Sequence, residues 1–311
     1  MGKTSIEWTD VSWPVVNGCR RVSPGCERCY AERLAATRLR HLPKYAGLAT
    51  YAKGGPRWTG ASRLWESDLE MPLRLRKPSR IFVADMGDLF YEAVPDEVID
   101  RVWAVMLLSP HHTFQVLTKR AERARRYLTD SKLYERVMRE ANAWRAARPK
   151  LAQIGLSCPV TMPAPWIWLG VSVEDQRRAD ERIPHLLATP AAVRFLSCEP
   201  LLGHVDLTRV AISADCTEDV LGDGEWHGEP DAPPWIDWVI VGSESGMHPR
   251  PMAIEWAVSL REQCAAAKVA IFTKQIGTPE GREQGDVKGG DPRWWPETAG
   301  GWPREFPAVH R

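Results

Sequence analysis

Three cysteines near the start of the chain have the types and the spacing of a metal centre. Cys19, Cys26 and Cys29 stand in the run NGCRRVSPGCERCY, a C-x6-C-x2-C pattern. Two cysteines separated by two residues can bring both sulfurs onto one metal, and Pro24-Gly25 supplies a tight turn before them. Three thiolates leave one coordination position open, which a catalytic centre needs and a closed structural zinc site lacks.

The spacing alone leaves the identity of the metal open. A 4Fe–4S cluster held by three thiolates keeps one iron that can bind a small molecule. A structural zinc ion would need a fourth ligand, for which the sequence offers Cys198, Cys158 and His248. A third interpretation is a phosphate-binding barrel in which the cysteines bind no metal.

Further candidate residues stand directly after short apolar runs. Asp85, Gly87 and Asp88 follow the run IFVA, where two carboxylates beside a glycine suit an ammonium group or ribose hydroxyls. The same carboxylates are also good helix N-caps. Lys119 and Arg120 follow the run FQVL and can bind a carboxylate or a phosphate.

Glutamates follow three more of these runs. If Glu174, Glu199 and Glu244 faced one mouth, they would repel each other unless they were protonated or paired with cations. The cations that the strand ends offer are Lys119, Arg120 and Lys274. We therefore take as catalytic candidates Glu174, Glu199, Glu244, Lys119 and Lys274.

The apolar runs that precede these residues are typical of buried parallel strands, because they are short and rich in β-branched and aromatic residues. They are Trp13–Val16, Ile81–Ala84, Phe114–Leu117, Ile167–Val171, Val193–Leu196, Trp238–Val241 and Ala270–Phe272. Helical stretches are expected between them at Asp96–Leu108, Ala121–Met138, Gln176–Leu187 and Ile254–Ala267. This alternation predicts an α/β fold with a parallel sheet.

Polar residues at the carboxyl ends of successive strands favour a partial or complete TIM-like β/α barrel. We expect a single domain over residues 1–311. Residues 132–165 are predicted to form a helical insertion with a proline-rich loop, and residues 203–234 a surface loop. The tail, residues 278–311, has little periodicity.

The composition limits the partners and the location of the protein. The 311 residues carry a net charge of +1, so nucleic acid or an anionic membrane would have to be met by a local patch. The arginine-rich stretch with Arg120, Arg123, Arg125 and Arg126 is either such a patch or a solvated helix. The polar N-terminus and the absence of a long apolar run predict a cytoplasmic protein with reduced thiols and no membrane span.

Motifs from Ser5 to about Gly277 resemble the three-Cys-motif proteins of phages and bacteria. They are SIEWTD, NGCRRVSPGCERCYAERLA, VADMGDLF, FQVLTKR, WLGVSVEDQ, RFLSCEPLLG, WVIVGSESG and KQIG, in one collinear order. That family is regarded as similar to the radical S-adenosylmethionine (SAM) enzymes, which have a partial β/α barrel. The first cysteine gap differs, since radical SAM enzymes commonly have C-x3-C-x2-C.

The resemblance implies that Cys19, Cys26 and Cys29 hold a 4Fe–4S cluster whose fourth iron binds SAM. Reductive cleavage of SAM would give a 5′-deoxyadenosyl radical that modifies or repairs a nucleic acid or nucleotide. A flavodoxin or ferredoxin would supply the electron, and a protein partner is also expected. The residues expected to bind the cofactor are Tyr30, Asp85, Gly87, Asp88, Ser172 and Glu174. The alternative is a zinc-containing, non-catalytic nucleic-acid-binding protein.

Overall fold

The computed structural model describes residues 4–148, 162–222, 235–245, 249–278, 292–297 and 301–307. The chain divides into two compact units: Met1–Leu169 with Thr189–Ala192, and Gly170–Ala188 with Val193–Arg311. The division falls inside strand β8 (Ile167–Ser172), so each unit is described by itself. The expectation of a single domain stays a prediction.

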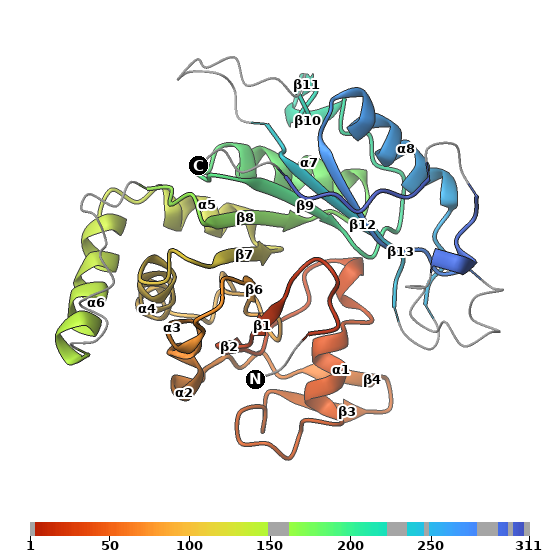
Figure 1. Cartoon of the computed structure of the whole chain (residues 1–311). Coiled ribbons are helices and arrows are strands. Elements are labelled where there is room, and N and C mark those ends of the chain that lie inside the picture. The colour runs from red at the N-terminus through yellow and green to blue at the C-terminus, as the bar shows by residue number, and fades with distance from the viewer. Residues whose placement is uncertain are drawn as a thin grey trace. The chain divides into compact units, whose positions relative to one another are not determined.

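The first unit is built on parallel strands (Figure 1). In this unit β1 (Val11–Trp13), β6 (Arg80–Val83), β7 (Thr113–Thr118) and the first part of β8 lie in that order. Strand β6 pairs in parallel with β1 and with β7. Their apolar side chains form a closed core in which the rings of Trp13 and Phe114 lie 6.0 Å apart.

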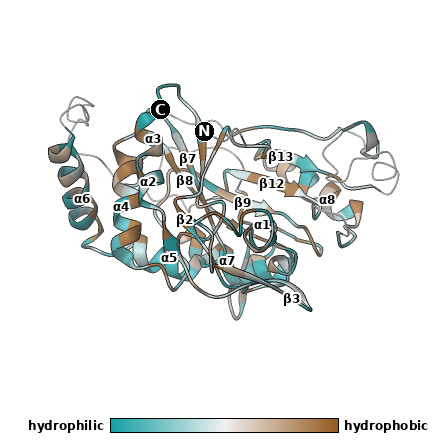
Figure 2. Ribbon diagram, turned by 90° about the horizontal axis from the view of Figure 1, so that it is seen from below, coloured by the Kyte–Doolittle hydropathy of each residue, from teal (hydrophilic) through white to brown (hydrophobic). Residues whose placement is uncertain are grey.

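Three helices follow these strands. They are α4 (Asp96–Leu107), α5 (Ala121–Leu128) and α6 (Leu133–Ala147). Helix α4 carries eight buried residues, whereas α5 is mostly polar, as the colouring of Figure 2 shows. The prediction of one helix over Ala121–Met138 is wrong, because the chain turns at residues 129–132, where the Asp130 carboxylate accepts a hydrogen bond from the Lys132 amide at 2.9 Å.

Small elements lie between β1 and β6. They are β2 (Val16–Asn17), the 3-10 helix η1 (Pro24–Cys26), α1 (Tyr30–Ala36), β3 (Ala49–Ala52), β4 (Gly55–Trp58), β5 (Arg63–Leu64), α2 (Glu66–Leu69) and α3 (Met71–Arg74). Strand β2 pairs with β5, and β3 with β4, both antiparallel. We call residues 18–60, which hold the three cysteines, the cysteine segment.

The strand predicted over Trp13–Val16 is replaced in the structure by two short strands, β1 and β2.

The second unit repeats the parallel arrangement. The rest of β8, β9 (Arg194–Cys198), β12 (Trp238–Gly242) and β13 (Ala270–Gln275) lie in that order, with β12 parallel to both β9 and β13. Its helices are α7 (Gln176–Leu187), α8 (Ile254–Ala266) and the 3-10 helix η2 (Pro292–Trp294). Strands β10 (Val210–Ser213) and β11 (Cys216–Glu218) form an antiparallel hairpin.

The structure confirms the mixed α/β class and the parallel strands. Six of the predicted strands and three of the predicted helices agree with the observed bounds to within a few residues. Helix α6 lies inside the predicted helical insertion, and the β10–β11 hairpin inside the predicted surface loop. Residues 149–161, 223–234 and most of the tail lie outside the described part of the chain. No helix in the described part is long and apolar enough to cross a membrane.

Candidate functional site

The three cysteines lie on one connected stretch of the first unit. Cys19 follows Gly18, Cys26 ends η1, and Cys29 is the residue directly before α1. All three are free thiols of intermediate exposure. A proline begins η1, and the chain turns directly after this short helix. The second and third thiols therefore lie on either side of one backbone turn, as the C-x2-C spacing predicted.

The thiols influence each other electrostatically. The pKa of Cys19 is raised to about 12, chiefly by burial and also by the Asp88 carboxylate and the Cys29 thiol, while the Arg120 guanidinium opposes the rise. Burial also raises the pKa of Cys29, against hydrogen bonds from the amides of Glu32 and Ala31, while Cys26 adds to the rise. Without metal, Cys19 and Cys29 are therefore neutral thiols, which a bound metal would have to deprotonate.

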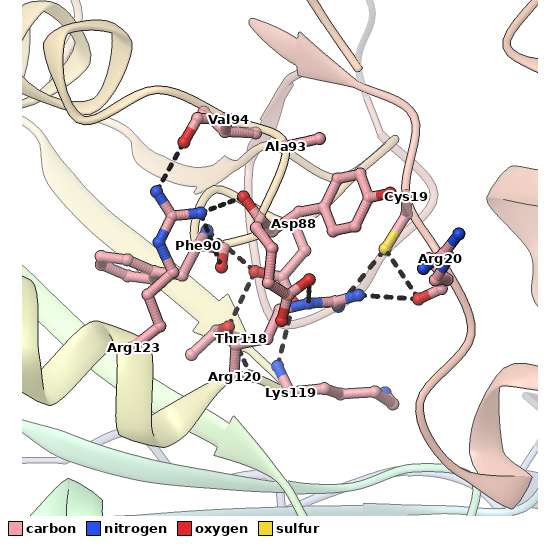
Figure 3. A network of polar contacts seen from close by, with 12 residues as sticks. Cys19, Arg20, Asp88, Phe90, Ala93, Val94, Thr118, Lys119, Arg120 and Arg123 are labelled. Carbon is pink, nitrogen blue, oxygen red and sulfur yellow. Dashed lines mark hydrogen bonds and ion pairs between the residues drawn. The ribbon is translucent and has the colours of Figure 1, made fainter. Parts of the chain in front are cut away.

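Asp88 and Arg120 form the centre of a buried polar network (Figure 3). The Asp88 carboxylate accepts hydrogen bonds from the Phe90 amide at 3.0 Å, the Thr118 hydroxyl at 2.7 Å and the Lys119 amide at 3.0 Å. Its Oδ2 also accepts a hydrogen bond from Arg120 Nη1 at 3.0 Å. Asp88 is only 5% exposed, so this carboxylate organises the protein interior, and its role as a cofactor ligand stays a prediction.

Arg120 connects this polar network to the first cysteine. Its Nη1 lies 3.4 Å from the Cys19 sulfur, and its Nη2 donates to the Arg20 carbonyl at 2.7 Å. The guanidinium also lies 4.9 Å from the centre of the Tyr91 ring. A planar group with several fixed donors can satisfy these partners at once, which a lysine ammonium cannot do. Sequence reasoning placed a cation here, but it could not show that the cation faces Cys19.

Two glycines bring the loop after β6 against the cysteine segment. Gly18 has φ +89° and forms an isolated parallel bridge with Gly87. A Cβ on Gly87 would lie 2.8 Å from the Val16 carbonyl oxygen and 3.0 Å from that of Gly18. The close approach expected at Gly87 is therefore an approach to the protein's own backbone. It fixes the start of the loop that carries the three cysteines, residues 19–29, which we call the cysteine loop.

A buried ion pair holds the other side of the loop. Glu32, in the first turn of α1, is 1% exposed and pairs with Arg21. The same carboxylate accepts a hydrogen bond from the Trp58 amide at 2.7 Å, and Arg21 donates to the Pro56 carbonyl at 3.1 Å. The cysteine loop, α1 and β4 are thus connected through one carboxylate. The sequence motif gave no signal for this role of Glu32.

Asp85 stands apart from Asp88 in its surroundings. The Tyr30 hydroxyl donates to the Asp85 carbonyl at 2.6 Å, and Ala84 before it has φ +56°. Asp85 Oδ1 is buried and has no hydrogen-bond partner among the described residues. Burial raises the pKa of Asp85 to about 6, against a hydrogen bond from Ser12 and the charge of Lys44. This carboxylate is the better-placed ligand of the two aspartates.

The three candidate glutamates all belong to the second unit, and each is paired there with a cation. Arg182 of α7 binds Glu174 at 2.8 Å and the Ser172 carbonyl at 2.6 Å. Glu199 pairs with Lys274. Glu244 is held by the Arg250 amide at 2.8 Å and by its guanidinium. Pairing with cations was expected, and Lys274 was among the expected partners, but the sequence analysis missed Arg182 and Arg250. The catalytic and cofactor roles of these residues stay predictions.

The candidate fourth ligands for zinc are placed only in part. Cys198 is fully buried in β9 of the second unit, where burial raises the pKa of its thiol. Cys158 and His248 lie outside the described residues. Across the described ranges, no group of three or more Cys, His, Asp or Glu side chains is arranged to hold a single metal ion. A cluster differs from such an ion because each thiolate binds a different iron.

The fold and this arrangement define an α/β protein with parallel strands and a three-cysteine loop anchored by an Asp–Arg network. The chain belongs to the family described as "Protein of unknown function (DUF5131)", whose model matches residues 3–292. No curated protein and no solved structure matches the chain.

Proposed function

We propose that the protein is an iron–sulfur enzyme similar to the radical SAM enzymes, with a 4Fe–4S cluster held by Cys19, Cys26 and Cys29. One observation carries this proposal: hydrogen-bond donors already point at two of the three sulfurs. Arg120 approaches Cys19, and the Ala31 and Glu32 amides approach Cys29. Hydrogen bonds to ligating sulfurs are a principal means by which proteins tune iron–sulfur centres.

Asp85 fits the binding of SAM. A buried carboxylate oxygen without a partner is an unsatisfied acceptor, and an ammonium group of a ligand supplies the missing donors. Asp88 stays a proposed ligand beside Asp85, and four donors of the protein already hold its carboxylate in place. Tyr30 positions the Asp85 backbone, and Ser172 and Glu174 remain proposed ligands in the second unit.

The bound cluster and SAM would supply one-electron chemistry that removes a hydrogen atom from a substrate. The residues of the chain have supporting tasks: Arg120 orients Cys19, Glu32 fixes α1, and Asp85 receives the ammonium group. As substrate class we propose a nucleic acid or nucleotide, and as electron donor a flavodoxin or ferredoxin. The same proposal includes a single domain with a partial β/α barrel, a protein partner and a cytoplasmic location.

Anaerobic reconstitution with iron and sulfide tests the cluster. We expect about four irons for each wild-type chain and broad charge-transfer absorption. Cys19→Ser, Cys26→Ser and Cys29→Ser should each lose most of the bound iron. Cys216→Ser is the matched control, because Cys216 is an exposed thiol of β11 in the second unit. Stoichiometric zinc with no iron would refute the cluster and favour a zinc-containing, non-catalytic nucleic-acid-binding protein.

Formation of 5′-deoxyadenosine by the reduced, loaded protein tests the second step. We expect this product from the wild type and from Cys216→Ser. Asp85→Asn should retain its iron but need a higher SAM concentration, since the amide lacks the negative charge that attracts an ammonium group. Equal SAM dependence in the wild type and Asp85→Asn would exclude Asp85 as the ligand.

A further inference from the structure

Positive charge is concentrated in the cysteine segment. Residues 18–60 contain nine lysines and arginines but only two acidic residues, a net charge of +7. The whole chain carries +1, so the remaining residues together carry −6. The small net charge of the protein therefore conceals a strong local patch of one sign, of the kind that attracts a polyanion.

Most of these charges lie at the surface of the protein. Arg21 and Lys44 are engaged in ion pairs, with Glu32 and Asp68 respectively. The other seven cationic side chains are exposed, and six of them are arginines: Arg20, Arg28, Arg33, Arg38, Arg40, Lys53 and Arg57. The only exposed acidic residue in the segment is Glu27. We call these seven residues the basic surface.

The basic surface is carried by one folded piece of the first unit. Helix α1 contacts both β3 and β4, and Figure 1 shows the three elements together. Ala31 and Ala35 pack with Tyr45 and Met86 in a small core beneath them. Because Glu32 also connects α1 to β4, the arginines are displayed on a fixed scaffold.

The kind of polyanion follows from the side chains. Arginine binds phosphate groups through two parallel hydrogen bonds and also stacks on flat rings, so a surface with six arginines and one lysine suits a phosphodiester strand. Tyr51 of β3, in the same segment, is 65% exposed and offers a ring on which a base can stack. A membrane surface is less suited, because the alanines of α1 are buried inside the protein.

We propose that the basic surface binds single-stranded nucleic acid through its phosphates, with Tyr51 stacking on a base. This inference rests on the proposed function in that it names the substrate class, and it places the strand next to the cysteine loop through Arg20 and Arg28. The arginines of α5 are weaker candidates. Arg120 is bound to Asp88, and Arg123 donates to Asp96 at 2.9 Å and to loop carbonyls.

Fluorescence anisotropy with labelled oligonucleotides tests the proposal on the full chain, loaded anaerobically. We expect single-stranded DNA or RNA to bind more tightly than a duplex, with an affinity that falls as salt rises. Arg38→Glu/Arg40→Glu should weaken binding about tenfold or more and lower the slope of log affinity against log salt by about 1 to 2. Tyr51→Ala should weaken single-strand binding by about 1 to 3 kcal/mol, about 5- to 150-fold.

Arg125→Glu/Arg126→Glu is the matched control, because it reverses two exposed charges on α5. We expect it to leave oligonucleotide affinity within about twofold of the wild type. An equal loss in both double variants, or a loss in the α5 variant alone, would overturn the proposal. Binding to vesicles of an anionic lipid but not to the oligonucleotides would also overturn it.

Iron content and 5′-deoxyadenosine formation, measured on the same variants, separate this inference from the proposed function. If the protein holds no cluster but binds oligonucleotides through Arg38 and Arg40, the proposed enzymatic function is refuted and nucleic-acid binding by the basic surface is supported. If the protein cleaves SAM but binds no oligonucleotide, the enzymatic function is supported and binding by the basic surface is refuted.

Discussion

Arg120 shows how one side chain serves both the fold and the site. It is 7% exposed, pairs with the 5% exposed Asp88, and reaches the sulfur of Cys19. A buried charge is retained only when its partners satisfy it, so removal of the cation leaves an uncompensated carboxylate. The cysteine loop thus depends on a residue about a hundred positions further along the chain.

Arg120→Met should lower the free energy of unfolding by about 3 kcal/mol, because Asp88 then remains buried without its cation. Arg120→Lys should cost less, about 1 to 2 kcal/mol, since it keeps the charge but loses the second guanidinium arm. Urea denaturation measures both changes. Arg125→Met, an exposed arginine on α5, should stay within about 0.5 kcal/mol of the wild type. Equal effects at the two arginines would contradict the network.

The raised pKa of Asp85 predicts a pH dependence of stability. Its pKa rises from 3.8 to about 6, mainly through burial, so the folded protein holds this proton more tightly than the unfolded chain does. The stabilising contribution is therefore complete below pH 3.8 and is lost as pH rises through about 6. Above that pH the folded protein carries a buried carboxylate that is poorly solvated.

Asp85→Asn removes this ionisation. We expect the variant to be more stable than the wild type by about 1 to 3 kcal/mol above neutral pH. The difference should shrink as pH falls through about 6 toward 4. Unfolding in urea across this pH range gives the measurement, and a difference that grows on acidification would show that the sign is wrong.

At the scale of elements, the loop after β6 and the cysteine loop are built against each other. Gly87→Ala should destabilise the protein by about 1 to 3 kcal/mol, because the new methyl group would press on the backbone oxygens of Val16 and Gly18. It should also reduce the iron bound after reconstitution. Gly54→Ala is the matched control, since its nearest neighbour is the end of the Arg57 side chain at 3.8 Å. Thermal unfolding and iron analysis should separate the two variants.

The regular elements could be predicted from the sequence because their signals are local. Strands such as β6 and β12 are short apolar runs with polar residues after them, and α7 begins and ends where its periodicity does. The hairpin β3–β4 was not predicted, since its strands have four residues each and are held by contacts with α1. The break between α5 and α6 was missed because a single turn interrupts an otherwise helical composition.

The same contrast holds for the site. The spacing of the cysteines is visible in one line of sequence, whereas the role of Asp88 depends on donors from β7 and the residues after it. A carboxylate at a strand end can bind a ligand or bind the protein, and only the three-dimensional arrangement of donors distinguishes the two. Asp85 and Asp88 are three residues apart and have opposite surroundings.

At the scale of the whole molecule, the uneven distribution of charge affects how separate copies of the protein associate. The cysteine segment carries +7 and the remainder −6, so separate copies can attract each other although the net charge is only +1. We expect self-association near pH 7 at about 20 mM salt that is reversed at about 300 mM, where screening acts over a few ångströms. Light scattering measures it, and Arg38→Glu/Arg40→Glu should reduce it.

The anchoring of the cysteine loop has a consequence for how the protein matures. Its two flanks are held by the Gly18–Gly87 bridge and by Glu32, and neither contact requires a metal. Small zinc fingers differ, since metal binding supplies their folding energy. Chelation should therefore leave the circular dichroism spectrum and the cooperative unfolding transition in place, and later addition of iron and sulfide should restore the proposed cluster. Folding and metal loading would then be separate events, and an apoprotein made when iron is scarce could be activated long after its synthesis.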